Sequence, residues 1–156
     1  MSDLIKTELP LTDDERAILK IIVSTIIPAS KEFNLPGAND AEIFNRILSH
    51  GQKHEDLLRQ GTKTIDEQSL ERFASPFVES SNADQSVLIG ELKSSNSPFV
   101  PILVSITLQG YYQDPRVLES VEMEARPPFP QGYEVEQGDW SLLDPVRNRE
   151  KFYRKV

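Results

Sequence analysis

Apolar residues recur at helical spacing along most of the first two thirds of the chain. The first such stretch begins after Thr12, which forms a capping box with Glu15, and it ends at Pro28. Within it, apolar side chains at three- and four-residue intervals make one broad face, the pattern of a helix packed on a core. The pattern therefore predicts an opening helix between Thr12 and Pro28.

Further helices are predicted downstream by the same combination of caps and apolar stripes. Asn39, with Glu42 three residues on, is predicted to cap a second helix that ends at Gly51. The weakly amphipathic stretch 52–74 predicts one or two short helices, and Asn82 is predicted to open another.

The most apolar segment lies at about 99–112, where hydrophobic residues occupy nearly every side of a helix. A helix that is apolar all round is typical of the centre of a bundle. We therefore predict an all-α fold, an irregular helical bundle around this central helix.

The last third of the chain has a different pattern. Four prolines and two glycines interrupt 127–145, yet the segment keeps apolar side chains. We predict a polar lead-in over 1–11, a helical domain over 12–126 and an extended tail over 127–156. The tail packs on its own domain or on a partner, and the residues predicted to contact a partner there are Phe129, Tyr133, Trp140 and Arg147.

Composition excludes several classes of function. The chain has 156 residues with a net charge of −8, which argues against a nucleic-acid binder because that function needs a cationic face. It has no cysteine and no glycine-rich phosphate loop, so we predict no cofactor bound by this chain. Neither a transmembrane segment nor a leader is evident, and a cytoplasmic location is expected.

No set of catalytic residues stands out. His50 and His54 have the i, i+4 spacing of paired metal ligands, but Gly51 lies between them and the zincin glutamate is missing. The carboxylates at 119–124 have no histidine or lysine beside them and are typical of a solvated acidic face. We therefore predict neither a catalytic residue nor a metal site.

The segment 107–116 is the most distinctive. Gly110 near the end of a buried helix indicates close approach of another backbone. Two adjacent tyrosines cannot both face one core, so Tyr111, Tyr112 and Arg116 are predicted to contribute to a partner interface. The alternative is that these side chains pack within the chain itself.

Several segments together resemble the gluconate 2-dehydrogenase subunit 3 family. They are LTDDERAILKIIVSTIIPAS at the start, PGA at 36–38, GYYQDPR at 110–116 and PPFPQGYEVEQGDWSLLDPVRNREKFYR in the tail. The resemblance implies a small, non-catalytic subunit of a sugar or sugar-acid dehydrogenase. It also implies that the chemistry belongs to an FAD-dependent large subunit of the glucose-methanol-choline type, often joined by a cytochrome c subunit.

One departure from the family concerns export. Family members often carry a twin-arginine leader, which this sequence lacks, so a periplasmic location is expected only if a partner carries the chain out. The leading hypothesis is thus a subunit that binds and stabilises a flavoprotein or assists its maturation. A free-standing helical adaptor and an unrecognised small enzyme are the alternatives.

Overall fold

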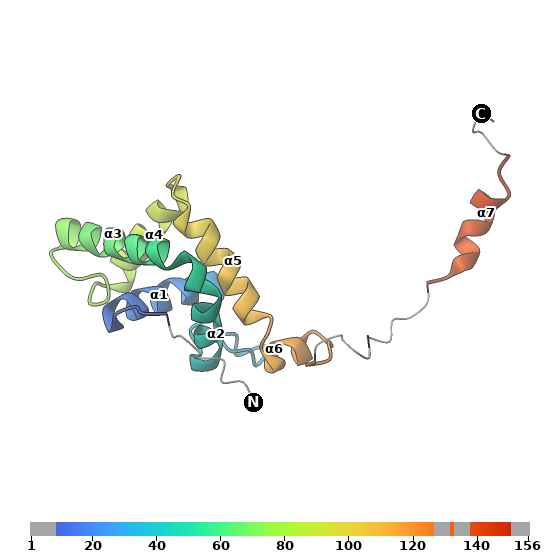
Figure 1. Cartoon of the computed structure of the whole chain (residues 1–156), viewed down its shortest axis with the longest axis horizontal. Helices are drawn as coiled ribbons and strands as arrows, with labels where there is room; N and C mark the ends of the chain where they lie inside the picture. The colour runs from blue at the N-terminus through green and yellow to red at the C-terminus, as the bar shows by residue number, and fades with distance from the viewer. Residues whose placement is uncertain (1–8, 127–131, 133–137, 151–156) are drawn as a thin grey trace. The chain divides into compact units, whose positions relative to one another are not determined.

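The computed structural model describes residues 9–126, 132 and 138–150. The chain divides into two compact units, Met1–Ala125 and Arg126–Val156. Within the described residues the regular structure is helical, apart from a single β-bridge between Ser30 and Leu35 (Figure 1). The predicted all-α class is therefore confirmed.

The first unit contains six α-helices among its described residues, and a short helical segment follows in the second unit. The elements are α1 (Asp13–Ile26), α2 (Ala41–Gly51), η1 (Gln52–His54), α3 (Glu55–Phe73), α4 (Asn82–Ser94), α5 (Phe99–Tyr111), α6 (Pro115–Ser120), η2 (Trp140–Leu143) and α7 (Asp144–Arg147).

Helix α1 begins as its sequence predicts. The Glu15 backbone N–H donates to Thr12 Oγ1 at 3.2 Å, and the Thr12 N–H donates to Glu15 Oε2 at 2.8 Å. This reciprocal pair is a complete capping box, which satisfies two N–H groups that the first turn would otherwise leave open. The helix ends at Ile26, before Pro28.

Two predicted caps are wrong by one residue. Asp40, not Asn39, caps α2, because its carboxylate accepts from the N–H groups of Glu42 and Ile43. Ser81, not Asn82, caps α4 and accepts from the Asp84 N–H. In both places two adjacent residues could act as the cap, and the path of the preceding loop selects between them.

The middle of the chain is more regular than its sequence predicts. Residues 55–73 form one helix of 19 residues, where one or two short helices were expected over 52–74. Gly51 does not stop α2 in a left-handed conformation, since the chain continues directly into η1. Gly51 is buried, and a Cβ on it would lie 2.9 Å from a Leu58 methyl carbon, so tight packing accounts for the glycine.

The core lies where α5 packs on α1, α2 and α3. The predicted polar lead-in contributes to it, because Leu9 and Leu11 are both buried. The largest fully buried side chains come from α1 to α6 and from the loop between α3 and α4, and they include Leu19, Ile43, Leu58, Phe77, Leu88, Phe99 and Ile106.

Helix α5 is covered on only part of its circumference. Phe99, Leu103 and Ile106 are buried, whereas Leu108 is 42% exposed and Pro101 is also exposed. The exposed side also contains Ser105 and Gln109, so α5 presents a mixed side to solvent where we had expected neighbouring helices to enclose it.

Gly110 makes the close approach that its sequence context predicts. A Cβ at this position would lie 2.7 Å from Ile47 Cγ1, 2.8 Å from the Ile47 backbone nitrogen and 3.0 Å from Ile47 Cα. Two of these three atoms belong to the backbone of α2 and cannot turn aside. The missing side chain is thus what lets α5 and α2 touch, and α5 has its most extensive helix contact with α2.

This contact predicts opposite effects for two glycine-to-alanine substitutions in helices. Gly110→Ala should lower the free energy of unfolding by about 2 kcal/mol, because it forces α2 and α5 apart. Gly90→Ala in α4 is the matched control: a Cβ there meets nothing within 4 Å, so alanine should raise stability by about 0.5–1 kcal/mol. Urea unfolding of both variants measures the difference, and equal effects would contradict the close contact.

Candidate functional site

The junction of α5 and α6 contains a buried carboxylate. Asp114 caps α6 by accepting from the Arg116 backbone N–H at 3.0 Å, and its side chain is fully buried. Two guanidinium groups neutralise it. Arg46 from α2 donates to Oδ2 at 2.5 Å, and Arg116 donates through Nε to Oδ1 at 2.9 Å and through Nη2 to Oδ2 at 3.0 Å.

The same arginine reaches a second helix terminus. Arg116 Nη2 donates to Asp40 Oδ1 at 2.8 Å, and Asp40 is the residue that caps α2. We call Asp40, Arg46, Asp114 and Arg116 the junction cluster. It joins the caps of α2 and α6 by charge-assisted hydrogen bonds, the stronger class of such bonds in proteins.

These contacts shift the titration of the cluster. Hydrogen bonds from Arg116, with help from Arg46, lower the pKa of Asp114 from 3.8 to about 2 despite its burial. The Arg116 hydrogen bond likewise lowers the pKa of Asp40. Asp114 and Asp40 in turn raise the pKa of Arg116. The ionised forms of Asp40, Asp114 and Arg116 are therefore each stabilised by another member of the cluster.

The two tyrosines of the junction have different environments. Tyr111 is only 4% exposed, and its hydroxyl donates to the Pro36 carbonyl oxygen at 3.0 Å, in the loop before α2. Burial raises the pKa of this phenol. Tyr112 is 52% exposed and meets the Tyr111 ring edge to face, with the ring centroids 5.4 Å apart. Tyr111 thus anchors the loop, and Tyr112 faces solvent.

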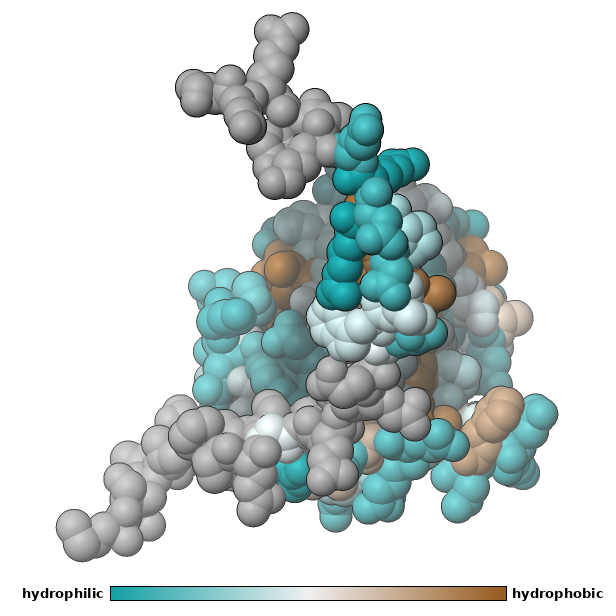
Figure 2. All heavy atoms as spheres, turned by 90° about the vertical axis from the view of Figure 1, so that its right-hand side faces the viewer, coloured by the Kyte–Doolittle hydropathy of each residue, from teal (hydrophilic) through white to brown (hydrophobic). Residues whose placement is uncertain are grey.

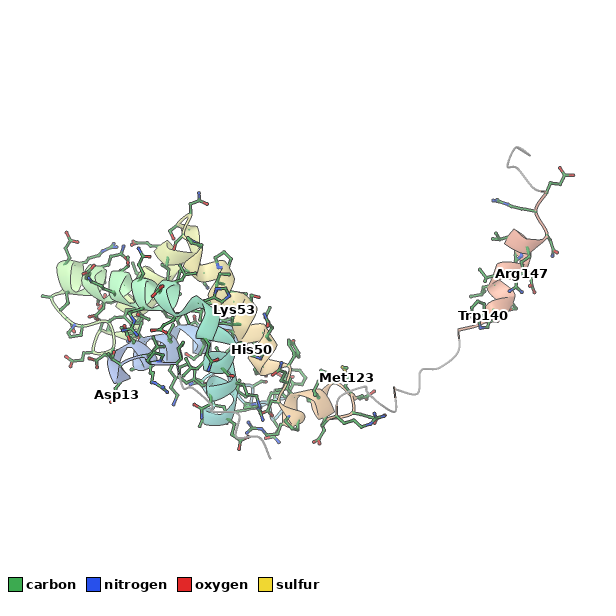
Figure 3. All side chains as sticks on the ribbon, viewed as in Figure 1. Asp13, His50, Lys53, Met123, Trp140 and Arg147 are labelled. Carbon is green, nitrogen blue, oxygen red and sulfur yellow. The ribbon has the colours of Figure 1, made fainter. Side chains whose placement is uncertain are left out.

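The histidine pair does not form a ligand set among the described residues. His50 Nε2 lies 3.0 Å from Gln113 Oε1, while His54 is the last residue of η1, outside α2 (Figure 3 shows His50 on its helix). In the part of the chain that the structure describes, no group of three or more histidine, aspartate or glutamate side chains could hold a metal ion.

A shallow depression of about 300 Å³ lies between α3, α4 and the start of α5. Of the residues that line it, only Glu91 is charged, and the others include Gln60, Gln68 and Phe99. General acid–base chemistry needs a tuned pair of titratable groups within reach of one another. The lining offers no such pair.

The residues predicted to contact a partner are therefore divided between several environments. Tyr111 and Arg116 make their contacts within the chain, which is the alternative that the sequence left open. Tyr112, Trp140 and Arg147 are exposed, with Trp140 at 61%. Phe129 and Tyr133 lie outside the described residues. Whether any of them contacts a partner stays a prediction.

Sequence reasoning missed three of the four members of the junction cluster. For Asp114, a usable signal was present, because an aspartate directly before a proline is typical of a helix N-cap with proline at the first position. Asp40 and Arg46 carried no comparable signal. A capping aspartate or a helix arginine that pairs with a distant residue has the same local sequence pattern as one that does not.

The face of the molecule drawn in Figure 2 is mostly hydrophilic where it is coloured. On the side drawn in Figure 2, hydrophobic residues show only as small patches. Exposed apolar side chains near the junction include Leu108, Tyr112, Val121 and Met123. Among the residues that the structure describes, no helix has both the length and the apolar character needed to cross a membrane.

The cluster predicts a loss of stability in acid. Because the pKa of Asp114 is lower in the folded chain than the ordinary 3.8, its ionised form stabilises the fold by about 2 kcal/mol above pH ~4. That contribution should disappear as the pH falls from about 4 to about 2.

Asp114→Asn should therefore lower the free energy of unfolding by about 2 kcal/mol at pH 7 and flatten its dependence on pH in that acid range. Chemical unfolding at a series of pH values measures both effects. Glu71→Gln, which removes an exposed carboxylate from α3, is the matched control. An Asp114→Asn variant as stable as wild type at pH 7 would contradict the role given to the cluster.

Comparison with known proteins gives one match. The searches of curated proteins and of solved structures found no match. The sequence profile of the family described as gluconate 2-dehydrogenase subunit 3 matches residues 13–127, which contain α1 to α6 with the junction cluster, whereas the tail segment beyond 127 lies outside the match. The chain belongs to the gluconate 2-dehydrogenase subunit 3 family.

Proposed function

We propose that this protein is a non-catalytic subunit that binds and stabilises the large subunit of a sugar or sugar-acid dehydrogenase, or assists its maturation. The large subunit is proposed to be an FAD-dependent oxidoreductase of the glucose-methanol-choline type, which would hold the flavin and perform the oxidation. A cytochrome c subunit is a further proposed partner. We propose a cytoplasmic location unless the large subunit carries the chain out.

The family membership is the observation that supports this proposal, because the family is named as a subunit of a dehydrogenase. The pairing of charged side chains within the chain is consistent with the proposed non-catalytic role. The carboxylates of Asp40 and Asp114 are committed to Arg46 and Arg116. Groups held in this way stabilise a fold and are not available for proton transfer.

The test is co-expression with a flavoprotein of this type encoded beside the gene. We expect the two chains to copurify, and we expect more FAD-loaded large subunit than when that subunit is expressed alone, because binding a folded partner shifts the folding equilibrium. The isolated small chain should show no flavin absorbance and no sugar oxidation with an artificial acceptor.

Two results would contradict the proposal. Stoichiometric FAD or dehydrogenase activity in the isolated chain would make it an enzyme. A large subunit that folds, loads FAD and never binds the small chain would favour the alternative of a helical adaptor for an unrelated protein.

A further inference from the structure

The C-terminal segment Asp139–Arg149 has local order of its own. Asp139 Oδ1 accepts from the Ser141 backbone N–H at 3.0 Å and from the Ser141 hydroxyl at 2.6 Å, which starts η2. Pro145 occupies the first turn of α7, and the Asn148 N–H donates to the Asp144 carbonyl oxygen at 3.0 Å. Each of these hydrogen bonds joins residues of the segment to one another, which gives it the local order of a short helical element.

The segment is amphipathic, with the apolar side exposed. With three residues per turn in η2 and 3.6 in α7, Leu142, Leu143 and Val146 fall with Trp140 on one half of the helical surface, with Arg147 at its edge. Ser141 and Asp144 fall on the other half. The exposed fractions of the apolar four are 61% for Trp140, 74% for Leu142, 42% for Leu143 and 62% for Val146. Apolar anchors at three-residue intervals are the pattern of a helix that inserts into a groove.

The net charge of the chain changes from negative to positive at Arg147, the last residue of α7. Residues 147–156 contain five basic residues and one acidic residue, whereas 1–146 contain 12 basic and 24 acidic residues. An end that is basic on an otherwise acidic chain favours a counter-surface that carries negative charge.

We infer that Trp140–Arg147 is a docking helix that inserts Trp140, Leu143 and Val146 into an apolar groove with an acidic rim on the dehydrogenase large subunit. This inference rests on the proposed function. The local order would lower the entropy cost of docking, because the helical turn exists before the partner arrives.

A protein groove fits the segment better than a lipid surface. Helices that bind anionic membranes carry lysine and arginine along their polar half. Here the helical segment carries a single basic residue, Arg147, which pairs with Asp144 at 3.5 Å, and the other basic residues follow the helix.

The affinity test uses the full chain and the purified flavoprotein, with the dissociation constant measured by biolayer interferometry. Leu143→Asp and Val146→Asp should each weaken binding by at least about thirtyfold, the size of an interface hot spot. Asn148→Asp adds the same charge just beyond the helix on the polar side, and it should change affinity by no more than about twofold. Arg147→Glu with Arg149→Glu should slow association and reduce its dependence on salt.

A second measurement follows Trp140, the single tryptophan of the chain. Its emission should be accessible to acrylamide in the isolated protein. In a chain labelled with 5-fluorotryptophan, the single ¹⁹F resonance should shift when the large subunit binds.

The possible failures can be distinguished. If wild type does not bind the flavoprotein at all, the proposed function fails and the inference falls with it. If wild type binds and the aspartate variants bind equally well, only the docking helix is overturned. Protection of Trp140 in the isolated chain would mean that the segment docks on its own protein. Protection by vesicles of phosphatidylcholine and phosphatidylglycerol, lost in the same variants, would assign it to lipid.

Discussion

The arrangement of this protein depends on a carboxylate that has been removed from water. A buried aspartate is costly unless its charge is neutralised and its oxygens are hydrogen-bonded, and Asp114 has both through two arginines and a backbone N–H. One of the arginines belongs to α2, and the other extends to the cap of α2. The cost of burying Asp114 therefore makes the position of α6 depend on that of α2. Any movement that separates them would break the ion pairs Arg46–Asp114 and Arg116–Asp40.

The contact between α2 and α5 is the apolar counterpart of this cluster. Gly110 lets the two helices touch at Ile47, and Tyr111, the next residue, bonds to the loop that precedes α2. Close packing, a hydrogen bond and ion pairs thus follow one another within seven residues, from Gly110 to Arg116. This explains why that short segment is the most distinctive in the sequence: Tyr111 and Asp114 turn inward, whereas Tyr112 and Gln113 are exposed.

The proposed role depends on the apolar side chains that are exposed to solvent. The polar groups with the strongest interactions are used to hold helices together, while apolar side chains stay in solvent on α5 and on the C-terminal helical segment. The exposed apolar side chains are the groups that the proposed association would use. Membership of a family of dehydrogenase subunits is in keeping with that division.

The sequence by itself determined the features that depend on neighbours along the chain. The all-helical class and the capping box of α1 both follow from residues within a few turns of one another, and the need for glycine at 110 was visible in its apolar context. The sequence did not determine which residues cap α2 and α4, because adjacent residues there have similar capping ability and loop geometry decides between them.

Only the tertiary structure decided which of the distinctive side chains face inward. Arg116 meets Asp40 across 76 positions of sequence, and Tyr111 meets Pro36 across 75. Local pattern cannot distinguish a tyrosine or an arginine kept for a partner from one that pairs with a distant part of its own chain, because both leave the same residue types in the same order. The difference arises when folding brings a carboxylate or a carbonyl oxygen within hydrogen-bonding distance, where pairing offsets the cost of burial.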